Sequence, residues 1–153
     1  MEFLDKKIKD DFEAAFKSRD EIKTGTLRML RAAIHNREIE KRGRGQDPTL
    51  TDEEVLEVAM KEVKKRREAI GMYINAGRNE LAEKELKELA VLEQYLPEQM
   101  NEEELKKIID EALKSFPGAT EKDFGKIMGQ VMKQVKGKAD SSVIGRIIKE
   151  KIQ

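Results

Sequence analysis

The chain has 153 residues, of which 41% are charged, 38% are hydrophobic and 5% are aromatic, and it contains neither cysteine nor tryptophan. The lack of cysteine excludes disulfides, thiolate metal sites and cysteine nucleophiles. Basic and acidic residues balance at 31 each, so the formal net charge is zero and does not point to a polyanionic partner. No apolar run approaches the ~18 residues of a membrane span, and the start, MEFLDKKIKDDF, has charges where a signal peptide is apolar. We therefore expect a cytoplasmic protein with no membrane partner.

Apolar residues recur at helical spacing along the first 96 residues and predict four helices. The expected helices carry their apolar faces over residues 3–16, 27–39, 55–74 and 81–96. The third begins at Thr51, whose spacing to Glu54 is that of a capping box. It ends near Gly77, a residue type that often follows a helix in a left-handed conformation. Pro97 closes the fourth.

The remainder of the chain predicts three shorter helices, with apolar faces over residues 105–116, 124–135 and 143–152. Asn101 and Glu104 repeat the capping-box spacing before the first of them, and Asp140 can cap the last. Two-residue alternation typical of strands is missing. The sequence thus predicts an all-α fold of about seven helices, with a long-helix N-terminal unit (1–96) and a three-helix C-terminal unit (97–153).

Residues that could carry chemistry are few. His35 is the single histidine and lies within a charged helical stretch, and no serine stands in a Gly-x-Ser-x-Gly turn. Glu-x-x-His pairs of a di-iron bundle and a phosphate-binding P-loop are also missing. The many carboxylates alternate with lysines, which is typical of solvated helix faces. We expect no catalytic residues, no metal site, no cofactor and no activity of the chain on its own.

Charge is sorted along the C-terminal unit. Residues 97–123 contain four lysines and eight acidic residues, whereas residues 124–153 contain seven basic and two acidic residues. Lys126 and Lys133 share the helix face opposite the apolar one, Lys136 and Lys138 follow in the next turn, and Arg146 lies on the last predicted helix. This pattern favours contact with phosphate groups.

Gly125 and Gly129 are four residues apart, so one strip of the same helix has no side chains. A bare strip lets another backbone approach closely. The spacing alone favours tight packing against a neighbouring helix of the same unit over a bound ligand. A second basic cluster, Lys61–Arg67, includes Arg66 and Arg67 and indicates either a solvated face or a contact with a partner.

Three stretches in combination resemble the YqeY family, which is related to the tail of the B subunit of tRNA-dependent amidotransferase. They are LRMLRAAIHNREIEKR (27–42), YINAGRNELAEKELKELAVLEQYLPEQMNEEEL (73–105) and GKIMGQVMKQVKGKAD (125–140). The resemblance covers nearly the whole chain and implies an all-α fold in two units. It also implies a role in tRNA handling and adds Arg78, of the AGR motif, to the basic candidates. The family label of carbon–nitrogen ligase with glutamine as amido-N-donor belongs to the whole amidotransferase.

We therefore expect a tRNA-binding accessory module associated with an amidotransferase or an aminoacyl-tRNA synthetase. The alternative is a protein–protein adaptor whose glycine strip receives a partner helix. The residues expected to bind RNA are Gly125, Lys126, Gly129, Lys133, Lys136, Lys138, Arg146, Arg66, Arg67 and Arg78.

Overall fold

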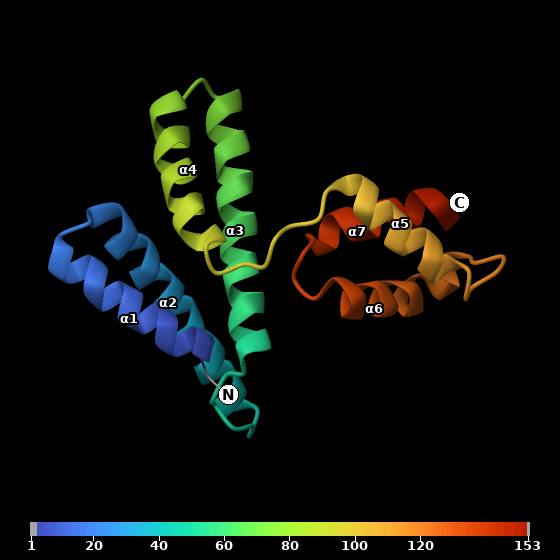
Figure 1. Cartoon of the computed structure of the whole chain (residues 1–153), viewed down its shortest axis with the longest axis horizontal. Helices are drawn as coiled ribbons and strands as arrows, with labels where there is room; N and C mark the ends of the chain where they lie inside the picture. The colour runs from blue at the N-terminus through green and yellow to red at the C-terminus, as the bar shows by residue number, and fades with distance from the viewer. Residues whose placement is uncertain (1–2, 153) are drawn as a thin grey trace. The chain divides into compact units, whose positions relative to one another are not determined.

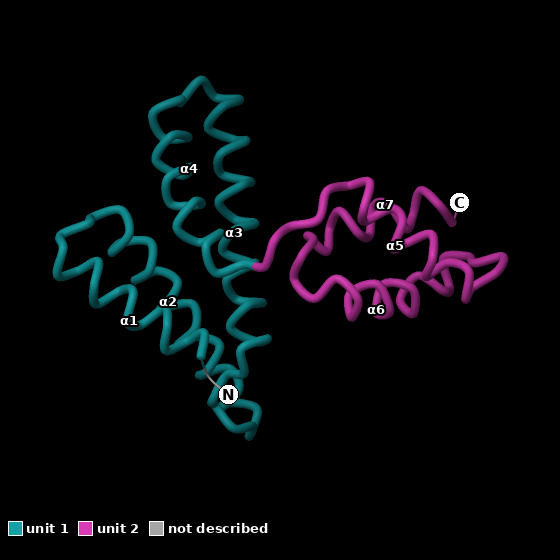
Figure 2. The backbone as a smooth tube through the Cα atoms, viewed as in Figure 1, with its two compact units in different colours: residues 1–96 teal, residues 97–153 magenta. Residues whose placement is uncertain are grey.

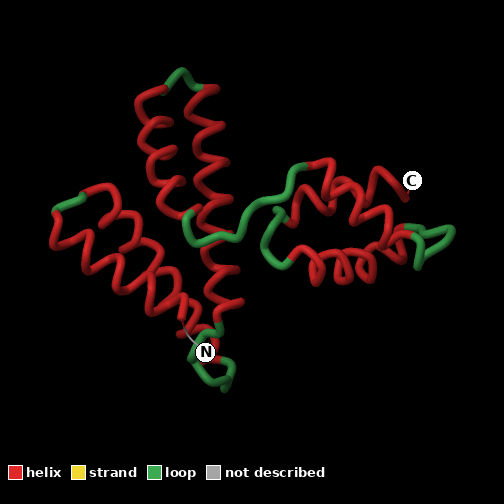
Figure 3. Tube along the Cα trace, viewed as in Figure 1, coloured by secondary structure: helices red, strands yellow, loops and turns green. Residues whose placement is uncertain are grey.

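The computed structural model describes residues 3–152, which form seven α-helices, one short 3₁₀ helix and no strand (Figure 1). The elements are α1 (Phe3–Ser18), α2 (Glu21–Gly43), α3 (Asp52–Asn75), α4 (Asn79–Glu93), α5 (Glu102–Leu113), η1 (Glu121–Asp123), α6 (Phe124–Val135) and α7 (Ser141–Ile152). Short loops connect them (Figure 3). The prediction of an all-α fold is confirmed.

The chain divides into two compact units, Met1–Leu96 and Pro97–Gln153 (Figure 2). Unit 1 consists of two helical hairpins, α1–α2 and α3–α4, in which neighbouring helices run side by side (Figure 1). Its buried core is built from Ile8, Leu27, Leu30, Ile34, Leu50, Val55, Val58, Ala59, Val63, Ile70, Leu89, Leu92 and Tyr95. Gly77 has a φ of 72° and turns the chain from α3 into α4. Residues with a Cβ are disfavoured at such a positive φ.

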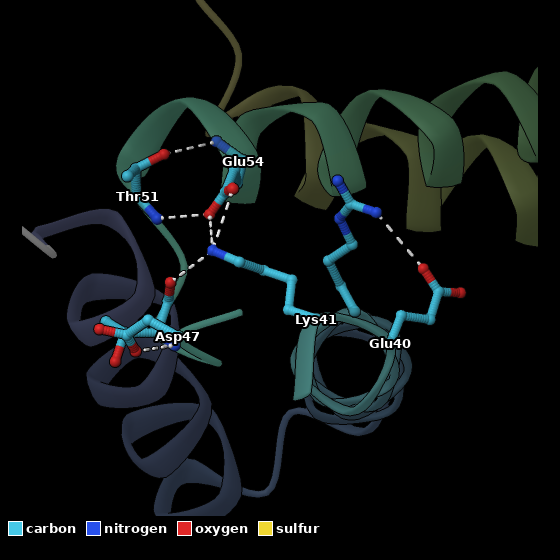
Figure 4. A network of polar contacts seen from close by, with 7 residues as sticks. Glu40, Lys41, Asp47, Thr51 and Glu54 are labelled. Atoms are coloured by element: carbon cyan, nitrogen blue, oxygen red, sulfur yellow. Dashed lines mark hydrogen bonds and ion pairs between the residues drawn. The ribbon is translucent and has the colours of Figure 1, made fainter. Parts of the chain in front are cut away.

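The start of α3 is fixed by the expected capping box. The Thr51 hydroxyl accepts the Glu54 N–H, and the Glu54 carboxylate accepts the Thr51 N–H (Figure 4). Lys41, on the last turn of α2, donates to both Glu54 carboxylate oxygens and to the Thr49 carbonyl. The hydrogen bond from Lys41, followed by that from the Thr51 N–H, lowers the pKa of Glu54. This network ties the end of α2 to the beginning of α3.

Unit 2 packs α5, α6 and α7 around a second core. Its buried residues are Leu105, Ile109, Ala112, Ile127, Val131, Val135, Ala139, Ile144, Ile147 and Ile148. The expected capping box at Asn101 and Glu104 begins α5. Asp140 accepts the Ser142 N–H at 2.8 Å, beside the first turn of α7. Each unit therefore has its own apolar interior, and its helices meet through the larger part of the predicted apolar faces. Other residues of those faces, most of them near an end, are exposed instead, namely Phe3, Phe16, Ile39, Ile74, Leu81 and Leu86.

Between residues 3 and 152 no helix combines the length and the apolar character needed to cross a membrane.

Candidate nucleic-acid interface

Helix α6 separates an apolar side from a basic side. Ile127 and Val131 are fully buried in the core of unit 2, whereas Lys126, Gly129 and Lys133 are exposed. The separation follows from the 3.6-residue helical repeat, which turns positions 126, 129 and 133 away from positions 127 and 131. The structure thus brings four of the expected residues together on the open side of one helix, since Gly125 is exposed there too.

The glycine strip of α6 is open to solvent. A Cβ placed on Gly125 or Gly129 would meet no neighbouring atom of the described residues within 4 Å. The expected packing of this strip against a neighbouring helix of the unit is therefore wrong. Helices α5 and α7 both meet α6 through its apolar side, which leaves the glycines uncovered. Met132 lies one turn after Gly129 and 37% of its surface is exposed, although the apolar spacing over residues 124–135 predicts it on the buried side.

Gln99 and Met100, near the start of unit 2, stabilise the turn that follows α6. Lys136 and Gly137 both have positive φ, 38° and 83°, so the helix ends in a left-handed turn. The Met100 N–H donates to the Lys138 carbonyl at 2.8 Å, and Gln99 Nε2 donates to the Gly137 carbonyl at 3.0 Å. These bonds hold Lys136 and Lys138 in a fixed, exposed turn directly after the basic side of α6.

The turn borders an open groove of about 610 Å³ within unit 2. Its lining residues are Glu98, Gln99, Met100, Asn101, Glu104, Lys107, Ile108 and Lys138. The groove is mixed in charge, so it has no single preference for an anion or a cation. No cluster of three or more metal-ligating side chains is present in the part of the chain that the structure describes.

The basic residues of unit 2 differ in whether their charge is already compensated. Arg146 is exposed but pairs with Glu102 and with Glu150, and these contacts raise the pKa of Arg146. Lys151 likewise pairs with Asp110 on α5. The lysines of α6 and of the following turn form no ion pair with the described residues of the unit. The charge of Arg146 is thus already compensated within the unit, whereas the charges of the α6 lysines are not.

Arg66 is buried, in contrast to the expectation that it binds RNA. Only 5% of its surface is exposed, and its Nη1 lies 3.2 Å from Glu62 Oε2. Its Nε lies 3.5 Å from Glu88 Oε2 on α4, within ion-pair range. The physical reason is helical spacing, because Arg66 falls one turn after Glu62 and one turn before Ile70, both on the core side of α3. A phosphate cannot reach it.

The other two arginines of unit 1 are accessible. Arg67 is exposed and its Nη2 lies 3.3 Å from Glu93 Oε1, an ion pair in which both side chains remain about half exposed. Arg78 precedes α4, where its N–H donates to the Tyr73 carbonyl at 2.7 Å and its side chain is exposed. They belong to unit 1, whereas the α6 lysines belong to unit 2.

Several proteins are similar to this chain. A protein of Pyrenophora tritici-repentis named altered inheritance of mitochondria protein 41, mitochondrial, is 29% identical over 147 residues, which cover 94% of this chain and 78% of that protein. Two proteins of the same name are also similar to this chain. The one from Saccharomyces cerevisiae strain YJM789 is 27% identical over 130 residues, which cover 81% of this chain and 68% of that protein. The one from Eremothecium gossypii is 33% identical over 89 residues, which cover 58% of this chain and 46% of that protein. The matched part is thus less than half of the Eremothecium protein.

These relatives contradict the expected cytoplasmic location, because their names assign them to mitochondria. The expectation rested on missing cysteines and a charged start of the chain. Lack of cysteine argues only against an oxidising compartment, so it does not distinguish the cytoplasm from other reducing compartments.

A family model matches the whole chain apart from residues 1–4 and residue 153, and this match shows the family. The family model described as Yqey-like protein matches residues 5–152, and the resemblance expected from the three sequence stretches is confirmed. The chain belongs to the Yqey-like protein family.

Proposed function

We propose that this chain is a tRNA-binding accessory module that works beside a tRNA-dependent amidotransferase or an aminoacyl-tRNA synthetase. The class of partner enzyme is inferred from the resemblance of residues 125–140 to the amidotransferase tail. The contact surface, called the α6 surface below, consists of Gly125, Lys126, Gly129, Lys133, Lys136 and Lys138.

The open glycine strip is the observation that carries this proposal. A glycine inside a helix costs about 1 kcal/mol relative to alanine, and no packing among the described residues offsets that cost at Gly129. A ligand backbone that approaches α6 closely benefits from the missing side chains.

The charge beside the strip supports a phosphate backbone as that ligand. Lys126 and Lys133 are exposed and have no carboxylate partner among the described residues, so binding would not have to break an ion pair. Each lysine that neutralises a phosphate releases a condensed counterion, which favours association at low salt. The role of the surface is therefore electrostatic contact combined with close approach.

A protein–protein adaptor is the second candidate, and Met132 is the observation that favours it. Met132 is partly exposed one turn after Gly129, and small residues next to a methionine also suit an incoming helix. The unpaired lysines around it would then select an acidic helix.

The test measures tRNA affinity of the full chain over a range of salt concentrations. We expect the logarithm of affinity to fall linearly with the logarithm of salt. The double substitution Lys126→Ala/Lys133→Ala should weaken binding and flatten that slope by about two units, one for each lost phosphate contact.

The matched control is Lys106→Ala/Lys114→Ala, which removes the same charge from an exposed position of α5 and from the exposed residue that follows α5. It should leave the slope unchanged, and neither variant should change stability by more than about 0.5 kcal/mol. Intact tRNA binding by the α6 variant would refute the proposed site. If, in addition, a complex with a protein resists ribonuclease and is abolished by Gly129→Ala, the adaptor function is favoured.

A further inference from the structure

We infer that the α1–α2 hairpin carries a second RNA contact, a stacking site for one unpaired base; this inference rests on the proposed function for its class of ligand. The site, called the Phe16 patch below, consists of Phe12 and Phe16 on α1 and Arg28 and Arg31 on α2. It lies in unit 1, so it is separate from the α6 surface of unit 2.

Phe16 supplies an accessible aromatic face. It is 62% exposed, and its ring centroid lies 6.4 Å from that of Phe12, with 28° between the two planes. Their four-residue spacing places both rings on one side of α1. Phe12 is half-buried and packs against the core of unit 1, so Phe16 has a fixed neighbour. A base that stacks on Phe16 would extend an aromatic pair that already exists.

Two arginines from α2 complete the patch. The guanidinium carbons of Arg31 and Arg28 lie 5.0 Å and 5.7 Å from the centroid of the Phe12 ring, within the range of cation–π contacts. Neither guanidinium forms an ion pair between residues 3 and 152. Their N–H groups can therefore donate to a phosphate while the aromatic ring keeps the side chains in place.

Aromatic rings beside unpaired arginines are the combination that binds single-stranded nucleic acid, where bases stack and phosphates meet the cations. A second copy of this chain fits less well, because a symmetric contact would bring the arginines of both copies together. A purely apolar partner would leave the guanidinium charges uncompensated. The charge of the patch therefore points to a ligand with both an aromatic face and a negative group.

The experiment uses the full chain and a single-stranded RNA of about four nucleotides, in which one base is replaced by fluorescent 2-aminopurine. Stacking should quench the fluorescence on binding. Phe16→Ala should remove the quench and reduce affinity about ten-fold, Phe16→Tyr should retain both, and Phe16→Leu should lose both because leucine has no aromatic face. Arg31→Ala should flatten the salt dependence by about one unit. Met72→Ala, an exposed apolar position on α3, serves as the control and should behave as the parent.

The outcomes separate this inference from the proposed function. If tRNA binding depends on Lys126 and Lys133 but Phe16→Ala leaves oligonucleotide binding unchanged, the stacking site is refuted and the α6 surface stands. If Phe16→Ala loses the oligonucleotide while Lys126→Ala/Lys133→Ala binds tRNA normally, the α6 surface is refuted and the patch stands. A Phe16→Leu variant that binds like the parent, or a Phe16→Ala variant that only converts a dimer to a monomer in sedimentation, would overturn the inference.

Discussion

Substituting alanine for Gly129 should stabilise unit 2 and weaken tRNA binding. Because the added Cβ meets no described atom within 4 Å, the change in stability reduces to helix propensity, about 0.8–1.0 kcal/mol in favour of alanine. For a unit of this size, 1 kcal/mol corresponds to a rise in Tm of about 4–8 °C. Gly125 is the second residue of α6, so its replacement should give a smaller gain than a position in the helix interior.

Differential scanning calorimetry of the full chain measures the shift, and salt-dependent tRNA binding measures the functional effect. Gly137→Ala is the matched control, because its φ of 83° forces alanine into a left-handed conformation, at a cost of about 1–2 kcal/mol. A lower Tm for Gly129→Ala would show that the strip is packed and would refute the reasoning. A higher Tm with unchanged tRNA affinity would remove close approach at Gly129 from the proposed function.

Three further outcomes are expected. Arg66→Ala leaves two largely buried carboxylates without their counter-ion, so the free energy of unfolding in urea should fall by about 3–5 kcal/mol. Arg67→Ala should change it by only about 0–1 kcal/mol, because the ion pair of Arg67 is exposed. Equal losses for the two variants would contradict the burial argument. Glu54→Gln should destabilise the protein at neutral pH, because the hydrogen bond from Lys41 lowers the pKa of Glu54 in the folded state. This stabilisation is lost as pH falls through the lowered pKa, so the difference in unfolding free energy between parent and variant should shrink below about pH 4. A difference independent of pH would refute this assignment. Tyr95→Phe should reduce the free energy of unfolding by about 1.5 kcal/mol, because the Tyr95 hydroxyl donates to the Asp11 carboxylate on α1 at 2.6 Å. An unchanged free energy of unfolding would show that this hydrogen bond contributes nothing.

The fold could be predicted because its signals are local. Thr51 and Asn101 each stand three residues before a glutamate, and both capping boxes form where that spacing places them. Gly77 turns the chain at the end of α3 with the positive φ that glycine favours. The periodicity of apolar residues then identifies the buried side along the central turns of each helix, since the helical repeat relates sequence spacing directly to direction.

The candidate site was less predictable because it depends on which sides of the helices meet. The spacing of Gly125 and Gly129 is the same whether the strip is packed or open, and only the arrangement of α5 and α7 decides. Arg66 lies in a basic run that looks solvated, yet its register places it on the core side. Phe16 continues the apolar periodicity of α1, but it lies in the last turns of the helix and remains largely exposed.

The two hydrophobic cores share no residue, and this has a consequence for how ligands can be located. Unfolding of a chain with two cores need not be a single cooperative transition, so one melting temperature does not describe it. A ligand stabilises the folded form of the unit that binds it, by an amount that grows with the logarithm of its concentration. Residues 97–153 form a unit below about 60 residues, a size at which stability is marginal. Calorimetry with added tRNA can therefore assign binding to a unit by the transition that moves, without any substitution.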